Sequence, residues 1–312
     1  MDNLKIGILG ANGFVGKELS DKLSQIKNVD LYLFSRKFNK EKHDLSKCYP
    51  FDIQKDLNNI PQELYQLDII YYLISDTIPA SSWGDVNEDI QHNLVPFVNL
   101  IEKLKLGNLK KIIFTSSAGT VYGTSKNKLD ENSLTNPYSP YGISKLTCEK
   151  YLNYFNQKNG IAFEIFRISN IYGPGQNTKK GLGIINTILE NHIDSKPTEI
   201  YGNGEAVRNY IYIDDVINIL AQSISNDIHE SYMLNLASND NISIHELIFC
   251  IENVVKQNLN IQYLPKRISD NPYISIDNTK LLNHLNGVQF HTLITGIEKT
   301  YQYLLTKESD KK

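Results

Sequence analysis

The feature of this sequence that most constrains its fold is a glycine-rich turn near the amino terminus. An apolar run at residues 6–9 predicts a strand, and apolar side chains at helical spacing predict a helix over residues 14–26. Between them lies GANGFVG (residues 10–16), whose glycines permit a sharp turn, a close backbone approach and tight helix packing. The N–H groups at the start of the helix would face an anion. The turn therefore predicts a site for the pyrophosphate of a dinucleotide.

The first half of the chain repeats this alternation of strand and helix. It predicts a doubly wound parallel α/β sheet of the Rossmann type, because short β-branched or aromatic runs alternate with amphipathic stretches. After residue 171, frequent Gly and Pro predict a smaller α/β substrate lobe. Strands are expected at 6–9, 29–34, 48–53, 69–74, 112–115 and 163–168, and helices at 14–26 and 89–106. The expected domains are a dinucleotide-binding domain (1–169 plus about 209–237), a substrate lobe (170–208 and 238–306) and a frayed tail (307–312).

Composition excludes several classes of function. The 312 residues include 32 basic and 35 acidic side chains, for a net charge of −3, whereas nucleic-acid platforms and polybasic membrane anchors need a basic excess. The three cysteines form no CxxC pair, and the histidines form no HExxH motif, so we expect reduced thiols and no metal site. No signal-peptide pattern and no run of about 18 apolar residues is found. We expect a cytoplasmic protein with no nucleic-acid or membrane partner.

A tyrosine and a lysine one helical turn apart are the candidate catalytic pair. Of four YxxxK matches, only Tyr141 and Lys145 follow a Ser-Pro dipeptide, which is typical of a helix start and places both side chains on one face. The pair also follows a strand that ends in Thr115-Ser116-Ser117. An ammonium about 4.5 Å from a phenol, at an effective dielectric of about 20, would lower the phenol pKa by nearly three units. We therefore expect the pair to act as a proton carrier, with Tyr141 giving up and taking back a proton near neutral pH.

Taken together, these motifs resemble the extended short-chain dehydrogenase/reductase family, in the nucleotide-sugar epimerase and dehydratase branch that includes UDP-glucose 4-epimerase. The resemblance implies a bound nicotinamide dinucleotide. It also implies that Tyr141 acts as base and acid on a sugar hydroxyl while Lys145 holds the nicotinamide ribose. The residues that carry it are 10–16, 52–53, 73–75, 93–94, 116–123, 139–145, 167–175 and 208–216.

The resemblance further implies a Ser or Thr hydroxyl on the strand before Tyr141. Counted from Val121-Tyr122-Gly123, that position falls on Ala118, which has no hydroxyl. We expect Ser117 to replace it, with Thr120 in reserve, although a one-residue shift on a strand turns a side chain to the opposite face.

The expected cofactor is NAD. Because no acid follows the second strand and Arg36 lies there instead, NADP remains the close alternative. The residues expected to contact the dinucleotide are Gly10, Asn12, Gly13, Phe14, Val15, Gly16, Ser35, Arg36, Asp52, Ile53, Leu73, Ile74, Ser75, Asn93, Ser116, Tyr141 and Lys145.

The expected substrate is a nucleotide-diphosphate sugar. The chain has only four arginines, and a planar guanidinium suits diphosphate oxygens better than an ammonium does. A structural role, paired with carboxylates or carbonyls, remains open for Arg267 and is favoured for Arg167. The residues expected to contact the substrate are Thr77, Ser117, Asn170, Arg208 and Arg267.

The favoured activity is 4-epimerisation of a nucleotide sugar, by hydride transfer at C4. The alternatives are a 4-dehydrogenase or a 4-keto reductase in surface-polysaccharide sugar synthesis, which would use the same base and cofactor. Dehydration is disfavoured because Gly119-Thr120 replace the usual Asp-Glu. An alternative of another class is a non-catalytic dinucleotide-binding sensor or scaffold, for which Ala118 is the best argument. A homodimer is expected, built by the helix of Tyr141 and the helix at 89–106.

Overall fold

The computed structural model describes residues 3–38, 47–79, 81–178, 183–266, 273–285 and 287–309. The chain divides into two compact units. The first contains residues 1–121, 137–167 and 217–234, and the second contains residues 122–136, 168–216 and 235–312. Arg267, a predicted substrate contact, lies outside the described residues.

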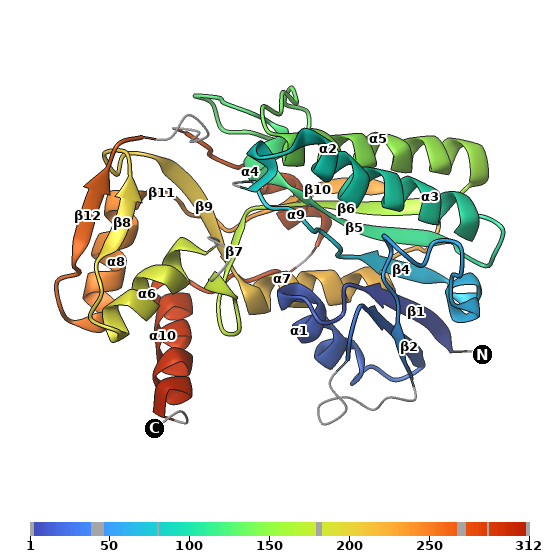
Figure 1. Ribbon diagram of the computed structural model, residues 1–312, viewed down its shortest axis with the longest axis horizontal. Coiled ribbons are helices and arrows are strands. Elements are labelled where there is room, and N and C mark those ends of the chain that lie inside the picture. Colours follow the sequence, from blue (N-terminus) through green and yellow to red (C-terminus); the bar gives the residue numbers. More distant parts are fainter. Residues whose placement is uncertain are drawn as a thin grey trace. The chain divides into compact units, whose positions relative to one another are not determined.

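The first unit is organised around a seven-stranded sheet in the order β10-β6-β5-β4-β1-β2-β3 (Figure 1). The chain leaves β1 toward β2 and β3 on one side and continues through β4, β5 and β6 on the other, with parallel pairing from β3 through β5. This order confirms the predicted doubly wound sheet. Its strands are β1 (Leu4–Leu9), β2 (Val29–Ser35), β3 (Cys48–Pro50), β4 (Ile69–Tyr72), β5 (Lys111–Ser117), β6 (Ala162–Ile168) and β10 (Tyr232–Leu236).

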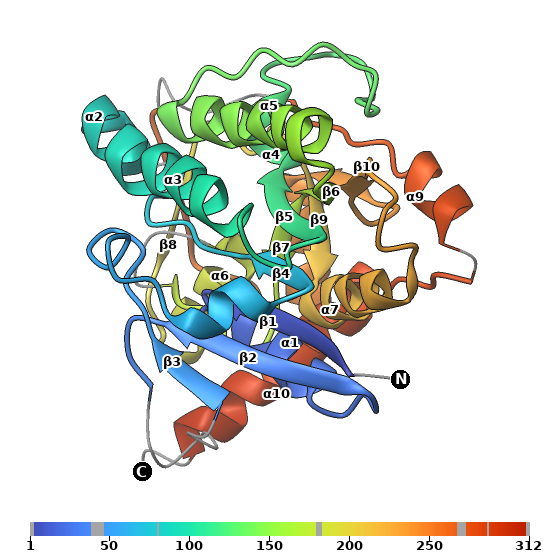
Figure 2. The same ribbon diagram turned by 90° about the vertical axis from the view of Figure 1, so that its right-hand side faces the viewer.

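Helices cover both faces of this sheet (Figures 1 and 2). On one face lie α3 (Val95–Leu104) and α5 (Pro140–Asn159), whose apolar sides pack with the strands in one core cluster. On the other face lie α1 (Phe14–Leu23) and the part of α7 (Ile213–Gln222) that belongs to this unit; the Tyr71 hydroxyl donates to the Leu220 carbonyl at 2.8 Å. Short helical segments complete the unit at Gln62–Gln66, Ser81–Trp83, α2 (Val86–Asp89), α4 (Ala118–Val121) and Ser223–Ser225.

The predicted helix at 89–106 is interrupted in the structure. A π-helical turn at Ile90–Leu94 precedes α3, and Pro96 lies at the start of α3. Proline has no N–H to donate to the carbonyl four residues earlier, so the α-helical ladder cannot run through this point. The helix predicted at 14–26 ends earlier, at Leu23, and the left-handed Asn28 (φ 63°) leads into β2.

The second unit contains a three-stranded sheet, β11-β9-β7, and a two-stranded sheet, β12-β8. Residues 122–136, which we expected in the first domain, pack here because Leu129 N–H donates to the Ser275 carbonyl and the Asn235 amide donates to the Leu129 carbonyl. The tail expected to be frayed from residue 307 is helical as far as Ser309. The elements are β7 (Asn170–Tyr172), α6 (Ile184–Ile193), β8 (Thr198–Tyr201), β9 (Val207–Tyr212), β11 (Asn241–Ser243), α8 (Ile244–Val255), β12 (Ile261–Leu264), α9 (Thr279–His284) and α10 (Leu293–Ser309).

Two general features bear on function. None of the helices in the described ranges combines the length and apolar character that a bilayer span requires. Within the same ranges, His, Cys, Asp and Glu side chains form no group of three suited to a metal ion.

Candidate active site

The glycine turn after β1 has the geometry of a cradle for phosphate. Gly10 has a φ of +92°, and a Cβ there would lie 3.3 Å from the backbone carbon of Leu73. A Cβ on Gly16 would overlap the Gly10 carbonyl oxygen. Helix α1 begins at Phe14, and its N-cap Gly13 has no capping side chain, so the first-turn N–H groups remain available to an anion. The turn therefore fits the pyrophosphate of a dinucleotide.

The turn lies at the topological switch point of the sheet. Strands β1 and β4 are neighbours, and the chain departs from them in opposite directions. The predicted contacts Leu73, Ile74 and Ser75 directly follow β4, and Leu73 N–H donates to the Leu9 carbonyl at 3.0 Å. Open α/β sheets bind ligands at this place. The fold thus brings together two sequence segments predicted to contact the dinucleotide.

Replacing Gly16 by Ala is expected to weaken NAD binding at least about tenfold, because the new methyl group must displace the Gly10 backbone and the start of α1. Isothermal titration calorimetry with NAD measures the change. Gly119→Ala is the matched control, because a Cβ at Gly119 meets no atom within 4 Å. If Gly16→Ala binds NAD as tightly as the wild type does, the turn is not part of the NAD-binding site.

Tyr141 and Lys145 lie on the first turns of α5, where Ser139 caps the helix by accepting from Gly142 N–H at 3.2 Å. The Lys145 ammonium donates to the Thr115 carbonyl at 3.0 Å and lies 5.7 Å from the centre of the Tyr141 ring. The pair lines a small hollow of about 10 Å³ together with Tyr72, Ile74, Asn93 and Ser144. The structure therefore places the predicted phenol and ammonium at the carboxyl end of β4 and β5.

The predicted lowering of the Tyr141 pKa is wrong for the protein by itself. Burial raises the pKa of Tyr141 to about 12, the charge of Asp89 acts in the same direction, and a hydrogen bond with Ser75 acts in the opposite direction. Burial also lowers the pKa of Lys145 to about 8. Both groups are removed from water, and this loss of solvation outweighs the attraction between the ammonium and the phenolate.

The hydroxyls at the end of β5 have different environments. Ser116 is buried and donates to Glu149 at 2.6 Å, and Glu149 is paired with Arg167 at 2.7 Å. This ion pair confirms the structural role favoured for Arg167. The Ser116 hydroxyl, which we expected to contact the dinucleotide, donates to Glu149 of the same pair. Ser117 is half-buried at the strand end, and the Thr120 hydroxyl lies 3.5 Å from its carbonyl. The expectation that Ser117 replaces the hydroxyl missing at Ala118, with Thr120 in reserve, stays a prediction.

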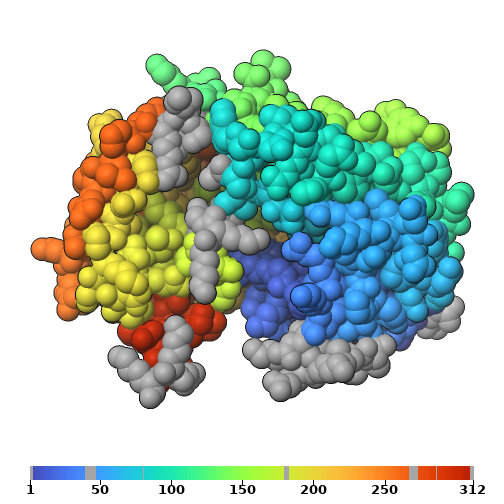
Figure 3. Space-filling model, in the orientation of Figure 1, coloured from blue at the N-terminus to red at the C-terminus, as the bar shows by residue number. Residues whose placement is uncertain are grey.

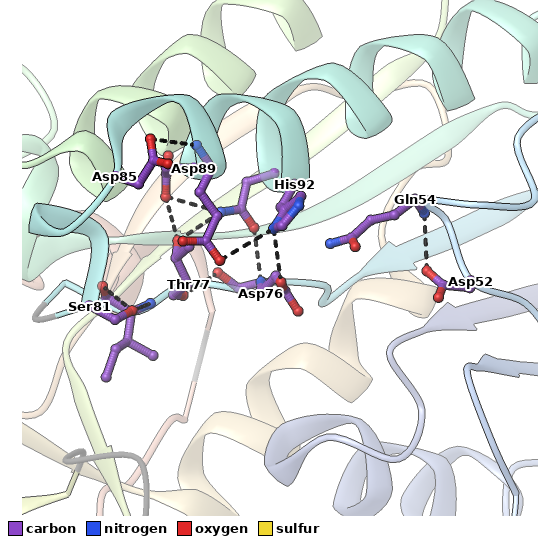
Figure 4. Close-up of polar contacts among 12 residues, drawn as sticks. Asp52, Gln54, Asp76, Thr77, Ser81, Asp85, Asp89 and His92 are labelled. Carbon is purple, nitrogen blue, oxygen red and sulfur yellow. Dashed lines mark hydrogen bonds and ion pairs between the residues drawn. The ribbon is translucent and has the colours of Figure 1, made fainter.

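Asp89 is a part of the site that sequence reasoning missed. Its side chain is fully buried, and its carboxylate accepts hydrogen bonds from Thr77, Asn93 and Ser144. Figure 4 shows Asp89 with Thr77. Thr77, predicted to contact substrate, thus directs its hydroxyl to Asp89. No sequence signal marks Asp89, because it lies in a polar stretch (GDVNEDIQHN) typical of an exposed segment.

The residues predicted around the adenosine have partners within the first unit. Arg36 is mostly exposed and lies 3.4 Å from Asp76, whose carboxylate is also 3.3 Å from His92. Asp52 accepts from Gln54 N–H at 3.1 Å and so stabilises the turn after β3 (Figure 4). Because an acid faces Arg36, its charge is partly neutralised, which weakens the argument for a 2′-phosphate. The Asn12 amide donates to the Lys37 carbonyl.

The second unit holds two predicted substrate residues and a large cavity. The Asn170 amide on β7 donates to the Asn209 carbonyl at 2.8 Å, and the guanidinium of Arg208 on β9 donates to the Val207 carbonyl at 2.8 Å. The cavity, of about 840 Å³, is lined in part by Tyr201 and Tyr273. Its other lining residues are Thr124, Ser125, Lys126, Gly202, Asn203, Gly204, Glu205, Ala206 and Lys266.

The switch-point turn and the strand order define a doubly wound protein of the dinucleotide-binding class. Residues 6–237 match the model of the NAD dependent epimerase/dehydratase family, and the chain belongs to that family. This confirms the resemblance found in the sequence and supports NAD as the cofactor.

Individual relatives agree with this assignment. The chain is 31% identical to a dTDP-4-dehydro-6-deoxyglucose reductase from Escherichia coli, over 81% of this chain and 83% of the relative. It is 26% identical to a UDP-glucose 4-epimerase from Mycolicibacterium smegmatis, over 96% and 98%. A solved UDP-glucuronic acid 4-epimerase from Bacillus cereus, in complex with UDP-glucuronic acid and NAD, matches with a TM-score of 0.87 at 23% identity, covering 97% of this chain and 100% of that one. The last likeness confirms the fold.

Proposed function

We propose that this chain is an NAD-dependent nucleotide-sugar 4-epimerase. The observation that carries the proposal is the placement of Tyr141 and Lys145 in one hollow at the strand ends, beside the glycine turn that fits a dinucleotide. The 4-epimerases among the relatives and solved structures support the same assignment.

For 4-epimerisation, the protein must move one proton and hold the sugar in place. When bound, NAD supplies the hydride acceptor and donor and a positive charge. Tyr141 removes the proton from the C4 hydroxyl and later returns it. With a pKa of about 12, its phenol is mostly protonated at neutral pH, so the base depends on positive charge beside it, and Lys145 supplies a part of that charge.

The second unit is suited to the nucleotide diphosphate. Tyr201 and Tyr273 offer aromatic surface to a base, while Lys126 and Lys266 bring positive charge to the same cavity. Arg208, on β9 of the same unit, offers a guanidinium that suits the diphosphate. Arg267 lies outside the described residues, and its contact with the diphosphate stays a prediction from the sequence. These groups fit a nucleoside-diphosphate sugar and leave its base and configuration open.

A 4-keto reductase is the second candidate. It is favoured by the 31% identity with a dTDP-4-dehydro-6-deoxyglucose reductase, and it would use the same proton carrier in the opposite direction. In that case Tyr141 donates a proton to the C4 oxygen as hydride arrives. The two candidates differ in whether the reduced cofactor is consumed.

Two measurements test the proposal. The purified protein is denatured, and the released dinucleotide is identified; NAD is expected. The native protein is then incubated with UDP-, GDP- and dTDP-sugars, and the products are analysed by NMR while absorbance at 340 nm is followed. A C4 epimer with no net absorbance change is expected. Consumption of reduced cofactor with a 4-keto sugar would establish the reductase, and bound dinucleotide without turnover of any sugar would favour a sensor or scaffold.

We also propose that the protein is a cytoplasmic homodimer. On α5, Ile143, Tyr151 and Tyr154 lie on one helical face, and each is at least 38% exposed. Val86 and Ile90 add exposed apolar surface near the start of the α2 to α3 segment, which reaches the molecular surface in Figure 3. The cysteines Cys48, Cys148 and Cys250 form no disulfide, which supports a reducing compartment.

Light scattering on the purified protein is expected to give twice the chain mass of 35.6 kDa. Two copies that bury the exposed apolar face of α5 account for this value. Ile143→Glu with Tyr151→Glu places charges on that face and is expected to give monomers. A wild-type monomer at micromolar concentration would contradict the dimer.

A further inference from the structure

Asp89 is a fully buried acidic residue without a cationic partner among the described residues. Its side chain has no exposed surface, and in the described part of the chain it forms no ion pair with a Lys, Arg or His side chain. A buried charge without a counter-ion is costly. A buried carboxylate of this kind beside a candidate active site is itself a candidate for a functional role.

Three donors from different segments converge on the Asp89 carboxylate. One oxygen accepts from the Thr77 hydroxyl, in the loop after β4, and from the Asn93 amide at 3.0 Å, in the π-helical turn. The other oxygen accepts from the Ser144 hydroxyl on α5. Since every partner donates, the side chain acts throughout as an acceptor, the role of a carboxylate. Asp89 therefore joins α5 to the loop at the switch point.

Two of these donors line the hollow of the candidate catalytic pair. Asn93 and Ser144 share that hollow with Tyr141 and Lys145. Besides Tyr141, the acidic groups of the described residues that act on Lys145 are Cys148, Asp89 and Glu149, and Glu149 is paired with Arg167. Cys148 is a buried thiol whose pKa is raised to about 12 by burial, so it carries no charge at neutral pH. Of the two carboxylates, Asp89 is therefore the one without a cationic partner in the described part of the chain.

We propose that Asp89 is a positioning residue that holds α5 through Ser144 and keeps the buried Lys145 ammonium charged; this inference rests on the proposed function for the role of the pair. Burial opposes the charged form of Lys145, and a nearby carboxylate favours it. The same carboxylate opposes ionisation of Tyr141, so it sets the proton affinity of both groups.

The sign of the effect follows from this arrangement. The negative charge of Asp89 raises the pKa of Lys145 and the pKa of Tyr141. A neutral side chain at position 89 lowers both. Activity that needs the Lys145 ammonium is then lost at a lower pH. In Asp89→Asn, we expect the alkaline limb of the pH profile of kcat/KM to shift to lower pH by about one pH unit.

Three variants separate charge from shape. Asp89→Asn removes the charge and keeps the size. Asp89→Glu keeps the charge and is expected to retain the wild-type alkaline limb with a lower rate. Ser144→Ala removes one hydrogen bond and keeps the charge, so its rate falls while the limb stays in place. If Asp89→Asn does not fold, as judged by circular dichroism, Asp89→Ser replaces it in the same comparison.

A measurement without sugar or turnover completes the test. Trace acetylation at a series of pH values, read by mass spectrometry of the peptide that contains Lys145, gives the pKa of that amine relative to the exposed Lys55. A midpoint about one unit lower in Asp89→Asn is expected. If the midpoint of Lys145 shifts in Asp89→Asn but the wild-type protein turns over no sugar, the role of Asp89 is supported and the proposed function is contradicted. An unshifted midpoint and an unshifted alkaline limb, with only a lower rate, would overturn the inference.

Discussion

Tyr141→Phe is expected to lower turnover of the nucleotide sugar about 10²- to 10⁴-fold, while NAD remains bound. The change removes one oxygen, the proton carrier of the proposed reaction. The ring stays in the hollow beside Lys145, so the binding surface keeps its shape. Initial rates measure the first quantity, and the dinucleotide released on denaturation measures the second.

The matched control for this variant is Tyr303→Phe. Tyr303 also begins a YxxxK motif, with Lys307, but it lies on α10 and is 38% exposed. Its turnover is expected to equal that of the wild type. A Tyr141→Phe enzyme that retains more than about a tenth of the wild-type rate would remove this phenol from the mechanism.

Lys111→Met is expected to lower the free energy of unfolding by about 3–5 kcal/mol. Lys111 on β5 and Glu164 on β6 form an ion pair of 2.7 Å, and neither side chain is exposed. Without the ammonium, Glu164 is left as an unpaired charge in the core. Urea unfolding followed by circular dichroism measures the loss.

Two controls distinguish a buried charge from ordinary packing. Lys110→Met removes the neighbouring ion pair with Asp68, whose lysine is about half exposed, and is expected to cost less than about 1 kcal/mol. Adding Glu164→Leu to Lys111→Met removes the unpaired charge and is expected to recover much of the stability. A double variant no more stable than Lys111→Met would show that the ion pair is not the cause.

Local sequence signals predicted most of the fold. The strand–turn–helix at Gly10 to Gly16 and the Ser139-Pro140 cap were readable because glycine conformation and helix capping depend on a few neighbouring residues. Pro96 is a local signal of the break in the helix predicted at 89–106, because proline cannot continue the α-helical hydrogen bonds.

The electrostatics of the site could not be predicted in the same way. The pKa of Tyr141 is raised because the fold buries it, and burial depends on segments distant in the sequence. The Ser116 hydroxyl is directed to Glu149, 33 residues further along the chain. Asp89 is joined to Ser144 across 55 residues. Such contacts leave no pattern in the local sequence.

The most direct test of hydride transfer at C4 follows an isotope. The nucleotide sugar that the substrate panel identifies is prepared with deuterium at C4 and incubated with the wild-type protein in ordinary water. The product is expected to be the C4 epimer with the deuterium retained at C4, because the hydride leaves and returns within one site. Inversion with loss of the label to water, or inversion at another carbon, would contradict the proposed reaction.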